Sequence, residues 1–302
     1  MKPNYMIIGA SKCATTTICN HLRQQRQHPD VCLIACKEPH FFSRDEVYTR
    51  GFDWYESLYD EAGDKKMRGE NSNTYTMKEV FPETVSRIVS YAPDLKLIYL
   101  VRDPITRIES FWLQKRANGR EGAHYDFNTA VRVNRHWLVD ASNYWQQINA
   151  YRPHFPDERI HIIFYEDFTA NPDAVMRRFF EFLDVDSDVP LANSNLHMGT
   201  TSGKPVARNT LSRLRSYSIF RKAVKLIPES VRNPLKERLF LRKFEGRPQW
   251  NQKTREWVAD ILEADTRKFL EYYGKPADFW NLRGLESGSK RGSDAVAKTL
   301  GV

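Results

Sequence analysis

The chain has 302 residues, of which 41% are hydrophobic and 13% aromatic, a composition typical of soluble globular proteins. Its length suits one large α/β domain or two small ones, and no stretch approaches the roughly 18 continuous apolar residues that a membrane-spanning helix needs. The net charge of +8 is uneven: residues 208–247 hold 12 Lys or Arg and 3 Glu, a local charge of +9, which leaves the remainder at −1. This distribution argues against a nucleic-acid-binding protein, whose positive charge would spread over a recognition face.

The N-terminus and the cysteines indicate a cytoplasmic protein. The first residues, MKPNYMII, carry one charge and too short an apolar run for a secretory signal. All four cysteines lie within the first 36 residues, and no second Cys/His cluster completes a zinc site. We therefore expect reduced thiols and no metal, with a disulfide or a metal site as the lesser alternative.

Residues 5–17, YMIIGASKCATTT, predict a strand, a tight turn and the start of a helix. This construction directs backbone N–H groups and the positive end of the helix dipole toward an anion. Lys12 and the threonines after it suit a phosphate or a sulfate, although an ordinary β-to-α turn with an incidental lysine is the alternative. In the ATP and GTP signature a glycine precedes the lysine and Ser or Thr follows it, whereas Ser11 and Cys13 flank Lys12.

A second polar segment, KEPHFF, follows a short buried strand expected at residues 31–34. Sites in α/β folds lie just beyond strand ends. Glu38 and His40 are two residues apart, so in an extended chain both would point the same way and line one pocket wall. The alternative is a solvated Lys–Glu pair that precedes a Phe–Phe core anchor.

The middle of the chain alternates between predicted helices and strands. Apolar spacing predicts a short helix at 52–59, a polar loop at 68–75 and a helix at 77–91. The continuously apolar residues 95–101 predict a central parallel strand, which ends at Arg102. Pro104 then opens a helix that carries Ser110, and Arg102 and Ser110 could form a second anion site or, alternatively, an Arg–Asp ion pair and a surface serine.

Helices are expected at 126–133 and 137–152, a strand at 159–164, and a helix from Pro172. A polar loop from Asn193 onward contains Ser202, Gly203 and Lys204. Next come the basic segment 208–247, which we expect to be helical, and a helix at 252–272. The alternation predicts a single α/β domain, residues 1–283, with a central parallel sheet flanked by helices. Residues 284–302 are Gly/Ser/Lys-rich and are expected to be a disordered tail.

Taken together, these segments resemble the PAPS-dependent sulfotransferases, whose bacterial members are related to the heparan-sulfate and carbohydrate branch. IIGASKCATTT resembles the family's 5′-phosphosulfate loop, and YLVRDPITRIESFW resembles its 3′-phosphate element, with arginine and serine eight residues apart. KEPHFF is similar to the stretch with the catalytic glutamate in the heparan-sulfate-type branch, and SGKPVAR resembles the late nucleotide-covering loop. The resemblance spans roughly residues 5–210 and implies a P-loop-like fold.

The resemblance also implies roles for individual residues. Glu38 would be the general base, Lys12 would stabilise charge as the sulfuryl group leaves, and His40 would assist or replace Glu38. The donor, 3′-phosphoadenosine 5′-phosphosulfate (PAPS), and the product PAP would contact Lys12, Cys13, Ala14, Thr15, Thr16, Thr17, Arg102, Ser110, Ser202, Gly203 and Lys204. The acceptor would contact Lys37, His40, Asn71 and Ser72.

Two departures from the family pattern affect this reading. Ala14 stands where the first loop usually has a glycine, which would crowd the approach of the backbone to the donor. In the heparan-sulfate-type branch, the loop that corresponds to residues 70–73 has lysine and then Ser-Pro, whereas this chain has Asn71 in place of the lysine. The loss of that cation argues against a heparan-like acidic polysaccharide.

The sequence therefore predicts a sulfotransferase that acts on a hydroxyl or amine of a small-molecule, glycolipid or saccharide acceptor. A nucleotide-dependent kinase is one alternative. A non-enzymatic module that binds anions or a membrane surface is another. For the basic segment 208–247 the alternatives are a solvated helical face, capture of an anionic acceptor, and peripheral membrane contact.

Overall fold

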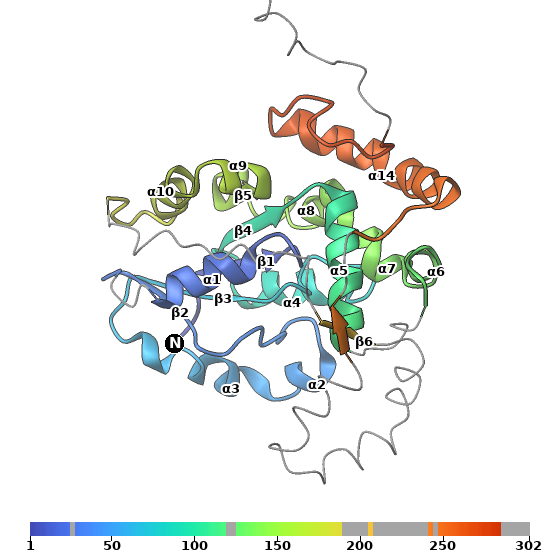
Figure 1. The fold of residues 1–302 in the computed structure, drawn as a ribbon. Coiled ribbons are helices and arrows are strands. Elements are labelled where there is room, and N and C mark those ends of the chain that lie inside the picture. Colours follow the sequence, from blue (N-terminus) through green and yellow to red (C-terminus); the bar gives the residue numbers. More distant parts are fainter. Residues whose placement is uncertain (25–27, 119–124, 189–204, 208–240, 244–246, 285–302) are drawn as a thin grey trace, which may run out of the picture.

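A five-stranded parallel sheet forms the centre of the fold, in the order β2-β3-β1-β4-β5 (Figure 1). The computed structural model describes residues 1–24, 28–118, 125–188, 205–207, 241–243 and 247–284. The strands of the sheet are β1 (Tyr5–Gly9), β2 (Val31–Leu33), β3 (Met67–Asn71), β4 (Lys96–Val101) and β5 (Ile160–Phe164). The predicted α/β class and the parallel sheet are thus confirmed.

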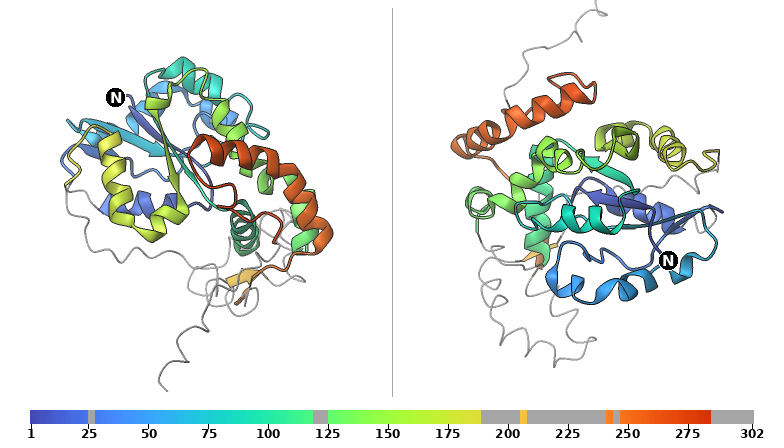
Figure 2. Two further views of the ribbon diagram at one scale, coloured as in Figure 1. Left: turned by 90° about the horizontal axis from the view of Figure 1, so that it is seen from above. Right: turned by 180° about the vertical axis from the view of Figure 1, so that it is seen from behind.

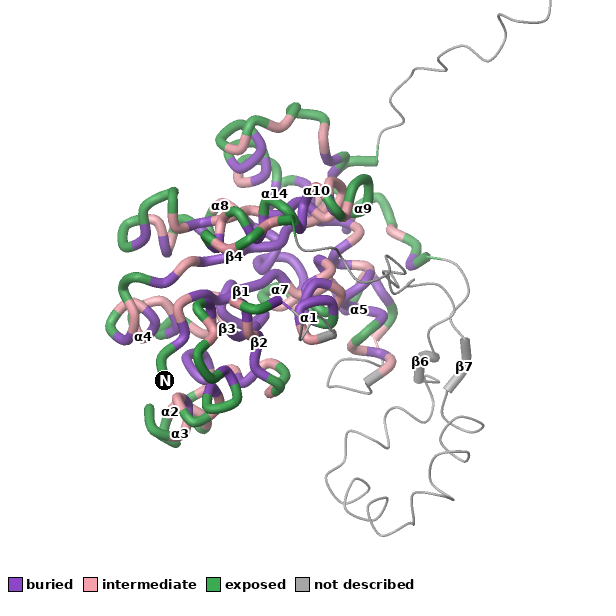
Figure 3. The backbone as a smooth tube through the Cα atoms, turned by 90° about the vertical axis from the view of Figure 1, so that its left-hand side faces the viewer, coloured by how far each residue is buried: buried purple, intermediate pink, exposed green. Residues whose placement is uncertain are grey.

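Helices cover both faces of the sheet (Figures 2 and 3). Right-handed crossovers explain this arrangement, because β1→β2 and β3→β4 run in opposite directions along the sheet and so place their helices on opposite faces. The helices over the two faces are α1 (Thr15–Gln24), α9 (Tyr165–Ala170) and α10 (Pro172–Phe182) on one side, and α4 (Thr84–Tyr91) and α8 (Tyr144–Asn149) on the other. All five residues of β1 are buried between these layers, as a central parallel strand requires.

The other helices in the described part of the chain lie around this centre. They are α2 (Asp45–Tyr48), α3 (Gly51–Ser57), α5 (Pro104–Asn118), α6 (Phe127–Val133), α7 (Arg135–Leu138) and α14 (Gln252–Tyr272), with 3-10 turns at Asp60–Ala62, Asp140–Ser142 and Asp157–Arg159. A second apolar cluster joins α5, α6 and α14 through residues such as Ile108, Val131 and Leu262. The predicted helix at 252–272 is therefore confirmed, and it packs against the helix that carries Ser110.

Two predicted helices are shorter than expected. The helix predicted at 77–91 begins only at Thr84, because Pro82 disfavours helical geometry in the residue before it. The helix predicted at 137–152 is broken into α7, a 3-10 turn and α8. Asp265 of α14 accepts the N–H groups of Trp145 at 3.0 Å and Gln146 at 2.7 Å, so it caps a separate helix there.

The predicted loop at 68–75 is also wrong in part, because residues up to Asn71 belong to β3. The segment MRGEN lacks the apolar run that marks the other strands. Gly69 allows the pairing: a Cβ at this position would lie 2.3 Å from the ring of Tyr5 on β1. Glu70 and Asn71 are polar but buried, and Glu70 lies behind the candidate site.

The basic segment is described only at its end. Leu241–Lys243 form β7, which pairs antiparallel with β6 (Pro205–Ala207), so the helical prediction is wrong at these three residues. β6 lies against α5 (Figure 1). Residues 208–240, the tail from 285 onward, and Ser202, Gly203 and Lys204 lie outside the described residues.

Candidate active site

Four polar segments follow the strands at one edge of the sheet. The loop with Lys12 follows β1, Arg102 follows β4, and Ser72 follows β3 directly; Glu38 lies five residues beyond β2. Because all strands are parallel, their carboxyl ends lie at the same edge, where open α/β sheets bind their ligands. The fold thus places the sequence-predicted segments on one side of the molecule.

The loop after β1 ends in the N-terminus of α1. Lys12 and Ala14 have φ angles of 74° and 68°, and this left-handed geometry turns the chain sharply before Thr15 begins the helix. The first N–H groups of a helix have no partner within it, and the first turn of α1 carries no acidic residue. The Ala10 N–H donates to the carbonyl of Leu100 at 2.7 Å, which ties the loop to β4. This arrangement fits a tetrahedral anion.

Ala14 is the residue of the first loop that departs from the family pattern. Its φ of 68° lies in the region that favours glycine. Glycine, the usual residue of the family at this position, would therefore suit this backbone conformation better than alanine. The Thr15 side chain is buried and that of Thr16 is exposed, with Thr17 between these extremes. Thr16 is therefore the threonine most open to a ligand from solvent.

Cys13 faces the interior. Its Sγ is buried 3.9 Å from the Tyr144 hydroxyl, and its N–H donates to the Ala10 carbonyl at 3.3 Å. Burial raises the pKa of the Cys13 thiol to about 12, although the positive charges of Arg107 and Arg102 oppose this shift. Both guanidinium groups therefore act electrostatically on the first loop. The thiol is neutral and supports the loop from within.

Tyr144 connects the two predicted anion elements. Besides its contact with Cys13, its hydroxyl donates to the Arg102 carbonyl at 2.7 Å. The Arg102 guanidinium lies 4.2 Å from the centre of the Tyr165 ring. This contact limits the positions of the guanidinium. Arg102 directly follows the end of β4, as the sequence predicted.

Ser110 and Arg107 lie on α5, the helix that follows Arg102. Ser110 is buried at 6% exposure. Arg107 is fully buried, and its guanidinium donates to the Ser142 hydroxyl at 2.6 Å and to the Leu138 carbonyl. Its Nη1 has no hydrogen-bond partner among the described residues. A buried cation with neutral partners adds positive potential beneath an anion site, a contribution that the sequence argument did not assign.

Glu38 and His40 do lie together, but not because the chain is extended. Both have positive φ angles, 52° and 57°. The turned backbone brings His40 Nε2 to 3.4 Å from Glu38 Oε2. Asn73 donates from Nδ2 to the other carboxylate oxygen, Oε1, at 2.8 Å. Each oxygen therefore has one polar neighbour and keeps lone-pair directions for a further hydrogen bond.

The orientation of the His40 ring follows from its second nitrogen. His40 Nδ1 lies 2.9 Å from Thr74 Oγ1, which lies 2.6 Å from Ser43 Oγ. With Nε2–H directed at Glu38, Nδ1 accepts from the Thr74 hydroxyl. Asn73 and Thr74 could not be identified from the sequence, because neither belongs to a recognisable motif.

The predicted acceptor contacts are placed differently from one another. Lys37 is exposed. Asn71 is buried at 3% exposure and Ser72 at 0%. The Ser72 hydroxyl donates to Glu70 Oε2 at 2.7 Å and accepts from the His40 N–H at 2.9 Å. Ser72 therefore supports the loop with Glu38 and His40 from behind.

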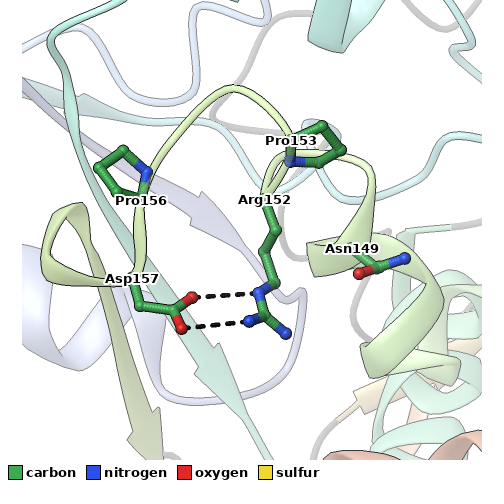
Figure 4. A pocket seen from close by; sticks show the side chains of 5 residues that line it. All are labelled: Asn149, Arg152, Pro153, Pro156 and Asp157. Carbon is green, nitrogen blue, oxygen red and sulfur yellow. Dashed lines mark hydrogen bonds and ion pairs between the residues drawn. The ribbon is translucent and has the colours of Figure 1, made fainter.

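A separate cavity of about 440 Å³ lies before the amino end of β5, at the opposite end of the strand from the candidate site; its lining side chains are shown in Figure 4. It is lined by Asn149, Arg152, Pro153, Pro156 and Asp157. Arg152 donates through two nitrogens to both carboxylate oxygens of Asp157, at 3.1 Å each. These residues precede β5, whereas the candidate site lies where the strands end, so the cavity is not part of it.

Two structural properties bear on other classes of protein. No helix among the described residues is long and apolar enough to cross a membrane. Within the same part of the chain, no three His, Cys, Asp or Glu side chains are grouped so that they could hold a metal ion.

Comparison with known proteins agrees with this arrangement. A crystal structure of a sulfotransferase from Alicyclobacillus acidocaldarius superposes with a TM-score of 0.64 and 22% identity, over 91% of this chain and 97% of that one. Human heparan sulfate glucosamine 3-O-sulfotransferase 3B1 is 26% identical over 249 residues, 80% of this chain and 61% of the relative. The human 3A1 enzyme is also 26% identical, with 59% of its length covered. The chain thus spans about three-fifths of these relatives.

The profile of one family covers most of the chain. It is described as the sulfotransferase domain and matches residues 2–224. This range contains both anion elements and the Glu38–His40 pair. The chain therefore belongs to the sulfotransferase domain family.

Proposed function

We propose that the chain transfers the sulfuryl group of PAPS to a hydroxyl or amine of a small-molecule, glycolipid or saccharide acceptor. The observation that carries this proposal is the Glu38 carboxylate, held between Asn73 and His40 at the sheet edge where the helix N-terminus of Thr15 lies. An anion site alone would bind a nucleotide. A positioned base beside it gives a reason to transfer a group.

The residues of the first loop and of α5 fit the donor. The loop N–H groups and Lys12 would bind the 5′-phosphosulfate, and Arg102 and Ser110 would bind the 3′-phosphate. Nη1 of buried Arg107, which has no hydrogen-bond partner in the described part of the chain, supports this fit, since a buried cation is costly unless negative charge comes near it. PAPS supplies an activated sulfuryl group, whose transfer depends mainly on in-line positioning and charge stabilisation.

Glu38 is the better candidate for the general base. The Glu38 side chain is 26% exposed and that of His40 17% exposed, so the carboxylate is the more accessible of the two. Glu38 would accept the proton of the acceptor as its oxygen or nitrogen bonds to sulfur. His40, held by Thr74, would keep Oε2 in place for this proton transfer.

The nature of the acceptor is less constrained. The curated relatives are named for heparan sulfate glucosamine, which supports a saccharide. Asn71 is buried and neutral where the related branch has lysine, and Lys37 is the exposed cation near Glu38. We therefore propose an acceptor with less negative charge than heparan sulfate. A cytoplasmic location and membrane contact through residues 208–247 stay predictions.

Incubation with PAPS labelled in the sulfuryl group tests the proposal. With fractionated saccharide, glycolipid and small-molecule acceptors, the wild type should form a labelled product without added metal, and Glu38→Gln should not. Phosphoryl transfer from Mg-ATP in the absence of sulfuryl transfer would instead establish a kinase. Co-sedimentation with vesicles that contain anionic lipid, in the absence of turnover, would favour a binding module.

A further inference from the structure

A buried carboxyl group lies behind the candidate active site. Glu70, on β3, has no exposed surface. The hydroxyls of Tyr55 and Tyr75 both donate to its Oε1 at 2.7 Å, and the Ser72 hydroxyl donates to its Oε2 at 2.7 Å. An acid carries a large desolvation cost when buried, and three donors to one carboxyl group offset part of it. Nothing in the proposed reaction uses this group directly.

Ser72 connects Glu70 to the loop that carries the base. Its hydroxyl has one proton, which it donates to Glu70, so its lone pairs are left to accept the His40 N–H at 2.9 Å. The carboxylate thereby fixes the direction of the serine hydroxyl. A serine without this acceptor could rotate and leave the His40 N–H unpartnered.

The loop needs such a support because its backbone is strained. Glu38 and His40 both occupy the left-handed region, at φ angles of 52° and 57°. Such conformations are unfavourable for residues other than glycine, and they persist only where the surroundings fix them. Ser72 binds the His40 backbone, while its neighbours Asn73 and Thr74 bind the Glu38 and His40 side chains.

We propose that Glu70 is a positioning residue, which acts through Ser72 to hold Glu38 and His40 in their reactive arrangement. This inference rests on the proposed role of Glu38. Glu70 would then contribute to the rate of the reaction although it is buried and does not contact the acceptor. Tyr55 and Tyr75 belong to the same hydrogen-bond network, since their hydroxyls hold Oε1 and so orient Oε2 toward Ser72.

The protonation state of Glu70 affects the hydrogen bonds of this network. Burial raises the pKa of the Glu70 carboxyl to about 7, the three hydroxyl donors oppose the shift, and the Glu38 charge adds to it. The other ionisable groups that face Glu70 are Tyr55, Tyr59, Tyr75 and Cys36. Once protonated, Glu70 must donate one hydrogen bond, so at least one of the three bonds reverses its direction.

Two variants that change the volume of the side chain little test the proposal through their effect on kcat. Glu70→Gln keeps the shape of the side chain, and Ser72→Ala removes only the connecting hydroxyl. We expect kcat to fall by about 10- to 100-fold in each, the loss typical of a small misplacement of a catalytic group. The KM for PAPS and the affinity for PAP should not change. In Glu70→Gln the pH profile of kcat should also lose an ionisation near 7, which a merely structural role would not move.

Amide hydrogen exchange at His40 gives a second measurement that needs no turnover. Exchange of the His40 N–H should accelerate in Ser72→Ala and in Glu70→Gln, because its acceptor is lost or freed to rotate. If either variant fails to fold, the other still provides both readouts. Unchanged kcat together with unchanged His40 exchange in a folded variant would overturn the proposal.

The tyrosines supply a matched control. Tyr55→Phe removes a donor to Glu70, whereas Tyr59→Phe removes a hydroxyl that lies 3.0 Å from Tyr55 and is not bonded to Glu70. Both hydroxyls are buried in the same cluster, and only Tyr55→Phe should lower kcat. Glu38→Gln separates the two proposals: full activity in that variant refutes the base, while the His40 exchange still reports whether Glu70 positions the loop.

Discussion

His40 Nε2 lies 3.4 Å from Glu38 Oε2, because both residues have positive φ angles and the chain turns sharply between them. Of the five described non-glycine residues with positive φ, four are Lys12, Ala14, Glu38 and His40. Strained conformations of this kind concentrate at functional sites, where the surrounding structure imposes them. The backbone alone thus marks the same two loops that the chemistry of their side chains marks.

Glu38→Gln should abolish most of the catalysis. The amide keeps the shape of the side chain but cannot accept a proton, so kcat should fall by about 100- to 10,000-fold, the contribution of a general base. Single-turnover sulfuryl transfer measures this loss. Glu46→Gln, at a carboxylate side chain that is 73% exposed, is the control and should leave kcat unchanged.

His40→Gln should cost less than Glu38→Gln, because an amide can still contact Glu38 without carrying charge. The pH profile of kcat separates the two roles. If His40→Gln were the more damaging variant, the imidazole and not the carboxylate would be the base.

Lys12→Ala should lower kcat more than it weakens PAP binding. A charged donor placed where negative charge develops contributes about 100- to 1,000-fold to the rate, whereas the loop N–H groups would continue to bind the 5′-phosphate. Turnover and PAP titration, done on the same preparation, test this difference. Lys253→Ala, at an exposed position of α14, is the matched control, and equal behaviour of the two variants would exclude the assigned role of Lys12.

Ala14→Gly should stabilise the fold. Relief of strain at a φ of 68° gains about 1–2 kcal/mol, and the greater freedom of glycine in the unfolded chain takes back about 0.5–1 kcal/mol. Urea unfolding should therefore give an increase of up to about 1 kcal/mol. A loss of stability would mean that the Ala14 methyl group makes packing contacts worth more than the strain.

Glu70 should make stability depend on pH. Burial raises its pKa from 4.5 to about 7, so the folded state holds this proton more tightly than the unfolded chain does. The resulting stability is complete below about pH 4.5 and is lost as the pH rises through about 7, a difference of about 3 kcal/mol. Urea unfolding from about pH 5 to about pH 8 should therefore show a smaller decline in Glu70→Gln than in the wild type. Parallel declines would contradict this account.

The sequence predicted those parts of the fold in which local pattern and burial agree. The apolar runs of β4 and β5 and the spacing of α14 gave these elements nearly to the residue. β3 was assigned to a loop from Arg68 onward because Arg68, Glu70 and Asn71 are polar. The burial of Glu70 depends on a partner distant in the chain, Tyr55. The break between α7 and α8 was missed because its cap, Asp265, lies 120 residues away from Trp145.

The site was predicted through motifs and not through geometry. Glu38 and His40 were expected to share a pocket wall from an extended chain, yet a left-handed turn brings them together. Asn73 and Thr74 carry no signal in a single sequence, since an amide and a hydroxyl in a polar loop have many possible uses. Their role becomes visible only once the loop after β3 is seen against the loop after β2.

Titration with adenosine 3′,5′-bisphosphate by calorimetry tests the central claim most directly. We expect binding without Mg²⁺, together with a marked loss of affinity in Arg102→Ala and in Ser110→Ala, because both residues would contact the 3′-phosphate. Adenosine 5′-monophosphate, which lacks that group, should bind more weakly to the wild type and equally to all three proteins. Binding of Mg-ATP alone, with no heat from the bisphosphate, would contradict the account.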